Sequence, residues 1–276
     1  MQGIEELAHA KVNLFLRVLR RREDGFHEIE TFMAPIKLCD SLELESANAF
    51  EFRCDEPGLV GDDNLVVRAA RLFFAETNRA PKVRLTLRKE IPHGAGLGGG
   101  SSDAAAALRG LNRFFEAGFS SEKVRTLGAQ LGSDVSFFVN ETAATCSGRG
   151  EIVKPAALRE PLSLLLLKPE FGVPSSWAYS RWRATREAAG EIYQSQKFGD
   201  IIFVNDLELP VFEKFVFLAQ VKSWLLKQPE VGAALMSGSG SAIFAVLRSK
   251  VDGESVATRA RDELDRELWS RVCETL

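Results

Sequence analysis

The chain has 276 residues, 45% of them hydrophobic and 26% charged, which is typical of a soluble globular protein and excludes a disordered chain or a disulfide scaffold. This length suggests one large domain or two ordinary ones, and it can bury a full hydrophobic core without metal or disulfide crosslinks. With 35 basic against 38 acidic side chains, the net charge of −3 gives no general attraction for nucleic acid.

The first predicted element is a half-buried strand over residues 10–19. Hydrophobic side chains alternate there with Lys11, Asn13, Phe15 and Arg17, a period of two. A lysine that points inward from an otherwise apolar strand is costly unless it is paired, so Lys11 predicts a buried partner. A turn at residues 23–25 and a second strand over residues 29–44 follow.

A helix comes next, and Asp62 or Asp63 is expected to cap it ahead of a hydrophobic face that begins at Leu65. Residues 82–91 alternate again and predict a strand, which Pro92 ends because proline cannot donate to the ladder. An alanine-rich helix is expected over residues 102–112 and another over 121–131, where Gly132 is placed to stop it.

The glycine-rich loop between the strand and the alanine-rich helix is the most informative segment. Five of the seven residues 94–100 are glycine, so the backbone N–H groups can close around an anion, helped by the dipole of the following helix. Two serines at the start of that helix add hydroxyls suited to phosphate oxygens or to a phosphate-bound Mg²⁺. The predicted nucleotide-phosphate site comprises Pro92, His93, Gly94, Ala95, Gly96, Leu97, Gly98, Gly99, Gly100, Ser101 and Ser102.

Other phosphate loops fit this segment less well. No Gly-Lys-Ser/Thr occurs, which excludes a Walker-type P-loop, and the His-Arg-Asp and Asp-Phe-Gly motifs of protein kinases are missing from the sequence. Gly94, Gly96 and Gly99 satisfy the dinucleotide-binding spacing. Two residues nevertheless separate this loop from the strand, and it starts a third of the way along the chain rather than in an N-terminal βαβ unit.

Asp134 is the main acid–base candidate. It lies just past the helix over residues 121–131 and just before an apolar run, where a helix N-cap and a general base are equally good interpretations. A pair with Lys11 would keep this carboxylate ionised and in a defined position.

The second half of the chain interleaves strands and helices. A change of composition between Pro155 and Pro161 predicts two domains, residues 1–157 and 158–276. We expect a strand over 162–168, a helical stretch near 175–190, helices near 200–228, a strand over 242–247 and a charged terminal helix. A glycine–serine loop at residues 236–241 could close over the same site as the first loop. This alternation is typical of an α/β or α+β protein.

The remaining signals concern metal and compartment. The four cysteines are far apart with no Cys-x-x-Cys pair, which favours reduced thiols in a cytoplasmic protein. The three histidines lack metal-ligand spacing. No apolar run approaches the ~20 residues that span a bilayer, and the first residues do not read as a signal peptide, so we expect no membrane partner.

Residues 92–106 resemble the ATP-binding motif of the GHMP kinases, the family of galactokinase, homoserine kinase and mevalonate kinase. One branch of that family is similar in segments whose order and spacing match over most of the chain. These segments are residues 10–16, 24–28, 96–105, 132–135, 145–150, 205–208 and 236–241.

The resemblance implies an α+β, two-lobed GHMP kinase fold with the site between the lobes. The N-terminal lobe would be like the second domain of a small-subunit ribosomal protein, and the C-terminal lobe would be ferredoxin-like. The implied reaction is transfer of the ATP γ-phosphoryl group, with Mg²⁺, to the 2-hydroxyl of a small alcohol that carries a cytidine diphosphate group, on the non-mevalonate route to isoprenoid precursors. We expect a monomer or weak homodimer that binds no nucleic acid.

The resemblance also implies residue roles. Asp134 matches the catalytic base, Lys11 matches the catalytic lysine beside it, and the glycine loop matches the ATP phosphate loop. The implied substrate contacts are Asn13, Phe26, His27, Tyr179, Gly238 and Ser239. His27 would read the edge of the cytosine, with the ring held between Phe26 and Tyr179, for which Trp177 is a rival. The family usually has tyrosine in place of Phe26. No metal ligand is fixed, although Ser101 or Ser102 is a candidate.

Three alternatives remain at this point. The chain could phosphorylate a different small alcohol, in which case the Phe26–His27 segment would have no cytosine to read. It could be a dinucleotide-binding oxidoreductase, which would leave Lys11 and Asp134 unexplained. It could be a non-catalytic nucleotide-binding module, which would be expected to have lost one of those two residues.

Overall fold

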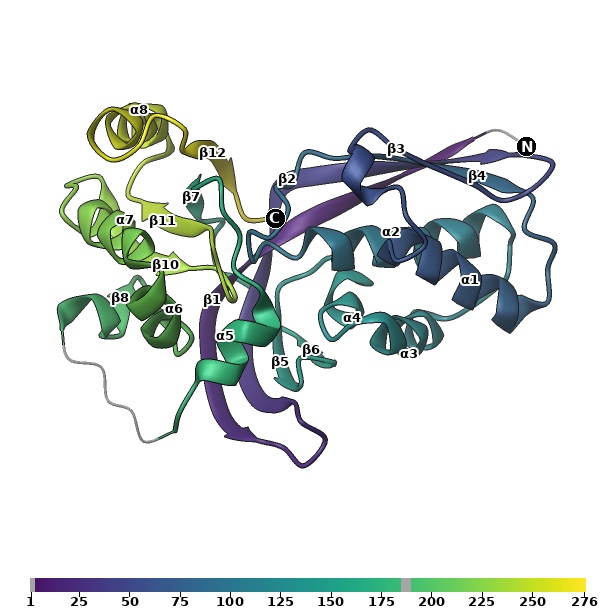
Figure 1. Cartoon of the computed structure of the whole chain (residues 1–276), viewed down its shortest axis with the longest axis horizontal. Helices are drawn as coiled ribbons and strands as arrows, with labels where there is room; N and C mark the ends of the chain where they lie inside the picture. Colours follow the sequence, from purple (N-terminus) through teal and green to yellow (C-terminus); the bar gives the residue numbers. More distant parts are fainter. Residues whose placement is uncertain (1–2, 185–189) are drawn as a thin grey trace.

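The computed structural model describes residues 3–184 and 190–276 and shows two lobes joined by a pair of long strands (Figure 1). These are β1 (Ile4–Arg21) and β2 (His27–Ser46), which pair antiparallel over nearly their whole length. The expected strands over residues 10–19 and 29–44 are therefore confirmed. Alternating residues of β1, among them Val12 and Leu14, are fully buried because both lobes pack against this strand.

Shorter strands extend this pair into an eight-stranded sheet. They are β3 (Glu51–Cys54), β4 (Val83–Arg88), β5 (Ala144–Gly148), β6 (Ile152–Pro155), β8 (Gln196–Phe198) and β9 (Ile201–Asn205). The order is β3-β4-β2-β1-β9-β8, with β5 pairing with β2 and β6 with β5. Because β4 runs antiparallel to β2, the glycine loop does not leave an all-parallel dinucleotide-binding sheet, and the oxidoreductase alternative loses its structural basis.

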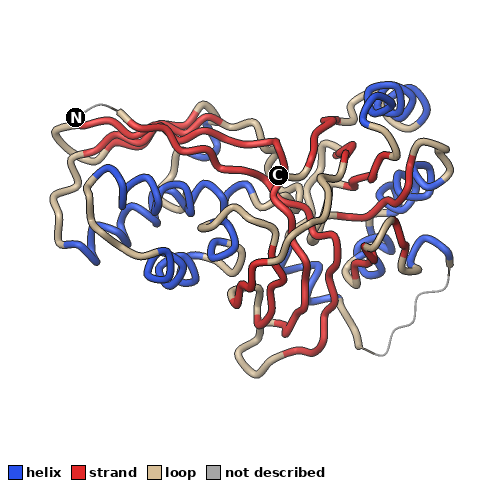
Figure 2. The backbone as a smooth tube through the Cα atoms, turned by 180° about the vertical axis from the view of Figure 1, so that it is seen from behind, coloured by secondary structure: helices blue, strands red, loops and turns tan. Residues whose placement is uncertain are grey.

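Helices lie along one side of the long strands in the N-terminal lobe (Figure 2). They are α1 (Leu65–Thr77), α2 (Gly99–Phe114), α3 (Ser121–Leu131) and the one-turn α4 (Val135–Phe138). Their apolar faces and the sheet form one core, in which Phe73, Leu85 and Phe137 are completely buried. The cap predicted at Asp62 or Asp63 is wrong. Asn64 caps α1, because its side-chain oxygen accepts the N–H of Val66 at 2.8 Å.

The C-terminal lobe is built on a four-stranded antiparallel sheet. Its strands are β7 (Ser163–Lys168), β10 (Val231–Met236), β11 (Ile243–Leu247) and β12 (Trp269–Glu274), in the order β10-β11-β7-β12. This order and the intervening helices give the βαββαβ arrangement of a ferredoxin-like lobe. The helices are α5 (Ser175–Arg181), α6 (Glu208–Lys214), α7 (Val216–Leu226) and α8 (Gly253–Glu263). The expected α+β, two-lobed fold is confirmed.

The two faces of this sheet have different partners, and that difference joins the lobes. Leu165 and Leu167 face the helices α6, α7 and α8. Leu164 and Leu166 point the other way and pack with Val12 and neighbouring residues of β1 and β2. The strand β7 is therefore hydrophobic on both faces, as a strand buried on both sides must be.

Some predicted elements were wrong. Residues 201–205, predicted as part of a helical region, form β9 and pair in parallel with β1 through Phe15 and Val204. The strands β10 and β12 were missed, and the predicted terminal helix is α8, which is followed by β12. The helical stretch near 175–190 ends at Arg181, and residues 185–189 lie outside the described residues.

The predicted boundary at 157/158 falls in the loop between β6 and β7 and stays a prediction. The later strands β8 and β9 cross back to the first sheet. Among the residues described, none of the helices is both long and apolar enough to traverse a bilayer.

Candidate active site

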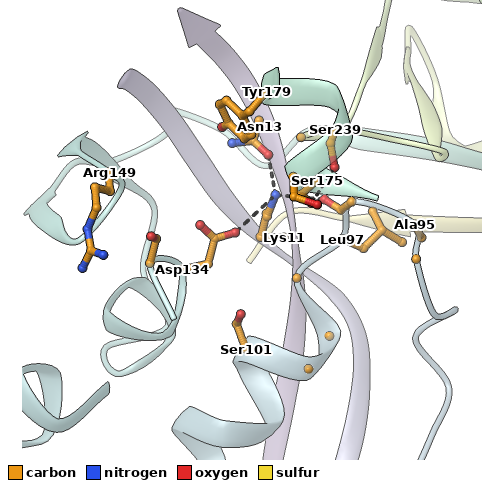
Figure 3. A pocket seen from close by; sticks show the side chains of 18 of the residues that line it. Lys11, Asn13, Ala95, Leu97, Ser101, Asp134, Arg149, Ser175, Tyr179 and Ser239 are labelled. Atoms are coloured by element: carbon orange, nitrogen blue, oxygen red, sulfur yellow. Dashed lines mark hydrogen bonds and ion pairs between the residues drawn. The ribbon is translucent and has the colours of Figure 1, made fainter. Parts of the chain in front are cut away.

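A cleft of about 1210 Å³ runs between the lobes and is lined by residues from both. The glycine loop between β4 and α2 forms its floor, β1 supplies Lys11 and Asn13, and the start of α4 supplies Asp134 (Figure 3). Residues that lie far apart in the sequence are therefore neighbours here.

The glycine loop needs glycine for two reasons. Gly94, Gly96 and Gly98 have φ values of 66°, 73° and 76°, which L side chains rarely adopt. The loop also lies against its neighbours without room for a Cβ atom: one built on Gly96 would lie 2.1 Å from the Ser237 carbonyl oxygen, and one on Gly98 would lie 2.6 Å from Cζ of Phe138. The loop is therefore held in one conformation by close packing rather than left free.

Helix α2 begins at Gly99, three residues earlier than predicted. Its first-turn N–H groups have no partners within the helix, and the positive end of its dipole lies at the cleft. Gly98, Gly99, Gly100 and Ser101 all line the cleft. This is the arrangement that binds phosphate groups.

The two serines at the start of α2 differ. Ser101 is half-buried and lines the cleft, where Figure 3 shows its hydroxyl facing the side of Asp134. Ser102 is completely buried, and its hydroxyl has no hydrogen-bond partner. The expectation that both hydroxyls reach the phosphate therefore needs correction, because the side chain of Ser102 points into the protein.

Lys11 is buried at the centre of the site. Its backbone N–H donates to the Leu97 carbonyl at 2.9 Å, which ties β1 to the glycine loop. Its Nζ donates to the side-chain oxygen of Asn13 and, at 2.8 Å, to the Gly96 carbonyl oxygen, and it lies 3.8 Å from Oδ2 of Asp134. Burial lowers the pKa of Lys11, and the charge of Asp134 partly offsets that effect.

Asp134 occupies the N-cap position of α4, but its carboxylate makes no capping hydrogen bond. The side chain is 35% exposed and faces the cleft beside Lys11. The sequence left two interpretations of Asp134, a helix N-cap and a general base. The residue stands at the N-cap position but makes no capping hydrogen bond, so its carboxylate remains available to a ligand.

The neighbouring Asn13 is fixed from behind. Its Nδ2 donates to Oγ1 of Thr31 at 2.8 Å, and that hydroxyl donates to the Phe15 carbonyl at 2.6 Å. The amide oxygen of Asn13 is thereby turned toward Lys11. Thr31 is a contributor that the sequence did not reveal, because a threonine in a strand carries no distinguishing signal.

The glycine–serine loop at residues 236–241 lies against the first loop, as its composition suggested. Ser237 Oγ donates to the Gly96 carbonyl at 3.0 Å, the same oxygen that accepts from Lys11. Gly238 and Ser239 line the cleft, and the hydroxyls of Ser239 and Ser175 are 2.8 Å apart.

The far end of the cleft is aromatic. The ring of Tyr179 lies 5.4 Å from that of His27, and Trp182 meets the same imidazole edge-on at 5.8 Å. Phe26 is half exposed, with the Arg149 guanidinium 4.6 Å from its ring centroid. Burial and the charge of a neighbouring arginine lower the pKa of His27, which favours a neutral imidazole that can donate and accept hydrogen bonds.

Trp177, the rival to Tyr179, lies elsewhere. It packs edge-on against Phe215 at 5.4 Å, with the Lys214 ammonium 4.7 Å from its ring, and lines a separate small cavity. Trp182 and Arg149 were not predicted. Arg149 sits in the matched segment 145–150, so that segment was the signal that could have identified it.

Beneath the glycine loop lies a buried ionic cluster. Lys89 forms ion pairs with Asp40 and, at 2.6 Å, with Asp103. Asp40 also accepts the N–H groups of Glu90 and Ile91 at 2.6 and 2.8 Å, just before the loop begins. Burial raises the pKa of Asp103 to about 8, and one of its oxygens has no hydrogen-bond partner.

The described residues fit one mode of Mg²⁺ binding. No three His, Cys, Asp or Glu side chains converge on a metal position within the described part of the chain. Mg²⁺ is commonly held by one or two protein oxygens together with phosphates and water. The Ser101 hydroxyl faces the cleft beside the glycine loop and matches that mode.

Comparison with known proteins identifies both halves of the chain. Residues 64–142 match the GHMP kinase N-terminal domain, and residues 180–266 match the GHMP kinase C-terminal domain. A 4-diphosphocytidyl-2-C-methyl-D-erythritol kinase from Methylacidiphilum infernorum is 40% identical over 99% of this chain and 97% of its own length. The enzyme of the same name from Thermodesulfovibrio yellowstonii is 34% identical over 98% and 96%.

Solved structures agree. A crystal structure of 4-(cytidine 5'-diphospho)-2C-methyl-D-erythritol kinase matches with a TM-score of 0.79 and 34% identity, over 99% of both chains. Homoserine kinase from Cytophaga hutchinsonii matches with a TM-score of 0.73 at 14% identity, over 99% of this chain and 94% of its own, and this likeness concerns the fold alone.

The close approach at Gly96 gives the first prediction. In Gly96→Ala the new Cβ cannot be accommodated beside the Ser237 carbonyl, 2.1 Å away, so the two loops must separate. We expect the KM for ATP to rise about tenfold or more and the thermal unfolding temperature to fall, because positive φ alone costs an alanine about 1–2 kcal/mol. Steady-state kinetics and thermal unfolding measure the two effects.

Gly118→Ala is the matched control, since Gly118 has the same φ of 73° but nothing within 4 Å of its Cβ position. It should lose stability and keep its KM for ATP. An equal KM change in both variants would contradict the packing argument.

The second prediction concerns pH. The Asp103 carboxyl, whose pKa burial raises to about 8 in the fold, loses its proton near pH 4 in an unfolded chain. The stability it contributes is therefore present at low pH and lost as pH rises toward 8. We expect Asp103→Asn, which has no such proton, to gain stability relative to the wild type as pH rises through this window, because the wild-type fold loses the benefit of the bound proton and the variant does not. Urea unfolding at several pH values measures this difference, and parallel profiles would contradict the prediction.

Proposed function

We propose that this chain uses Asp134 and Lys11 to phosphorylate the 2-hydroxyl of 4-diphosphocytidyl-2-C-methyl-D-erythritol. The chain belongs to the kinases that act on this compound, within the GHMP kinase family. ATP is the phosphoryl donor. The reaction is a step on the non-mevalonate route to isoprenoid precursors. The observation that carries the assignment of residues is the 3.8 Å approach of Lys11 Nζ to Asp134 Oδ2 beside the glycine loop.

The chemistry needs few groups. As the substrate hydroxyl attacks the γ-phosphorus, a new P–O bond forms, the bond from the γ-phosphorus to the bridging oxygen breaks, and ADP leaves with those electrons. Asp134 accepts the hydroxyl proton, and Lys11, 3.8 Å away, holds that carboxylate in place. Asn13, which is held by a hydrogen bond to Thr31, orients the substrate hydroxyl that attacks.

The phosphate groups of ATP would lie on the glycine loop, over residues 94–101. The free amides of the first turn of α2 and its dipole stabilise negative charge there, which is the main source of rate enhancement in such a site. Mg²⁺, when bound, would neutralise charge on the phosphates. The Ser101 hydroxyl is the group that would hold it.

The cytidine end of the substrate fits the aromatic end of the cleft. We propose that His27 hydrogen-bonds the edge of the cytosine and that Phe26 and Tyr179 stack on the ring. Tyr179 is supported over Trp177 because it shares the cleft with His27. The phenylalanine at position 26 keeps the stacking face and lacks the phenolic hydrogen bond that tyrosine would give. Gly238 and Ser239 would border the reacting end.

We further propose that the enzyme acts in the cytoplasm as a monomer or weak homodimer, with domains 1–157 and 158–276. All four cysteines are free thiols, and every group invoked above comes from one chain. No nucleic acid is needed for this activity.

Removing the proposed base gives a direct test of the mechanism. Asp134→Asn keeps the shape of the side chain and loses the proton acceptor, so the variant should fold, bind ATP and turn over at least about 100-fold more slowly. Single-turnover kinetics and an ATP-binding isotherm separate the two properties. Asp200→Asn, which changes an exposed carboxylate, serves as the control and should leave both unchanged. Near-normal turnover in Asp134→Asn would reject the assignment.

Substrate choice is tested by product formation. With Mg-ATP, we expect ADP release in the presence of 4-diphosphocytidyl-2-C-methyl-D-erythritol and none above background with polyols that lack cytidine, because stacking and hydrogen bonding at His27 supply much of the binding. Equal rates with both would favour a kinase for another alcohol.

A further inference from the structure

The segment over residues 205–208 has no role in the mechanism above. It joins β9 to α6, and β9 pairs with β1, the strand that carries Lys11. Asn205 is only 4% exposed. A buried amide must place its donors and its acceptor on partners, so its contacts show what it holds.

Asn205 holds the turn between β10 and β11. Its Nδ2 donates both to the Met236 carbonyl at 2.8 Å and to the Gly238 carbonyl at 2.7 Å. Its Oδ1 accepts the N–H of Leu207 at 2.9 Å, which fixes the direction of the amide. One side chain therefore bridges the end of β10 and the tip of the glycine–serine loop.

A buried ion pair fixes the same turn from a second direction. Glu208 Oε1 accepts the N–H of Met236 at 2.9 Å, and Oε2 pairs with Lys222 Nζ at 2.5 Å. Asp206 meanwhile ties the segment to β1, since it accepts the Val18 N–H at 2.9 Å and pairs with Arg17.

The turn over residues 237–240 also contacts the groups that surround Lys11. The Gly96 carbonyl oxygen accepts from Ser237 Oγ at 3.0 Å and from Lys11 Nζ at 2.8 Å. A Cβ built on Gly238 would lie 3.2 Å from Lys11 Nζ and 3.2 Å from that same oxygen. The turn is thus one wall of the space that holds the lysine ammonium.

We propose that Asn205 is a positioning residue for phosphoryl transfer: by holding the turn over residues 237–240 against Gly96, it keeps the Lys11 ammonium beside Asp134. This inference rests on the proposed catalytic role of Lys11. It assigns a task to the C-terminal lobe in the reaction itself, in addition to its task in binding.

A double-mutant cycle tests whether Asn205 acts through Lys11. Asn205→Ala should lower kcat about tenfold, with each KM changed less than about threefold, because coupled neighbours typically interact on this scale. Lys11→Met should lower kcat much further. In the Lys11→Met background, Asn205→Ala should cause no additional loss. Losses that multiply would overturn the inference, because they would mean that Asn205 acts without Lys11.

A stability role alone would give a different result. It would reduce the amount of active enzyme by the same factor in either background, so active protein is counted by ATP titration and thermal unfolding is recorded for each variant. Asn112→Ala is the matched control, since that amide also bridges backbone groups, at 2.9 and 3.0 Å from N and O of Phe119, in the N-terminal lobe. It should lower the unfolding temperature and leave kcat per active molecule unchanged.

If Asn205→Ala does not fold, Ser237→Ala takes its place in the cycle, because it removes only the hydroxyl that meets Gly96. It should lower kcat in the wild type and not in Lys11→Met, and multiplying losses would again overturn the inference. The proposed function fails separately, if Lys11→Met alone turns over normally.

Discussion

One carbonyl oxygen, that of Gly96, connects the parts of this site. It accepts hydrogen bonds from Lys11 Nζ and from Ser237 Oγ, so the first strand, the glycine loop and the C-terminal lobe meet at a single acceptor. A lysine that is buried at this depth can stay charged only with such partners, and burial already lowers its pKa. The position of Lys11 therefore depends on the packing of both lobes.

A buried cluster of charged side chains lies next to each of the two loops. Lys89, Asp40 and Asp103 lie under the glycine loop, and Lys222 with Glu208 lies under the glycine–serine loop. Buried ion pairs add little net stability over apolar packing, but breaking one is costly. In each cluster a carboxylate also accepts a backbone N–H group near the start of the loop. Asp40 accepts that of Glu90, and Glu208 accepts that of Met236. Their placement suits the task of holding a glycine-rich backbone in one conformation.

The sequence predicted the features whose signal is local. The alternation around Lys11 indicated a buried strand, and the glycines before an alanine-rich segment indicated a tight loop leading into a helix. That this loop binds phosphate stays a prediction. What it could not provide were partners from distant segments. Nothing near Asn205 shows that its amide meets Gly238, and the run over residues 201–205 gave no sign that it pairs with β1. Trp182 was missed because nothing in the sequence shows that its ring packs against His27.

The inserted strands β8 and β9 have a consequence for motion. The strand β9, from the second half of the chain, pairs with β1 of the first sheet. At its end, the side chain of Asn205 donates to the carbonyls of Met236 and Gly238, so the first sheet is hydrogen-bonded to the turn between β10 and β11 of the second. A hinge that swung the lobes apart here would have to break these two hydrogen bonds. Opening the cleft in that way would leave the buried amide of Asn205 without these partners, which is a cost that any movement of whole lobes has to meet.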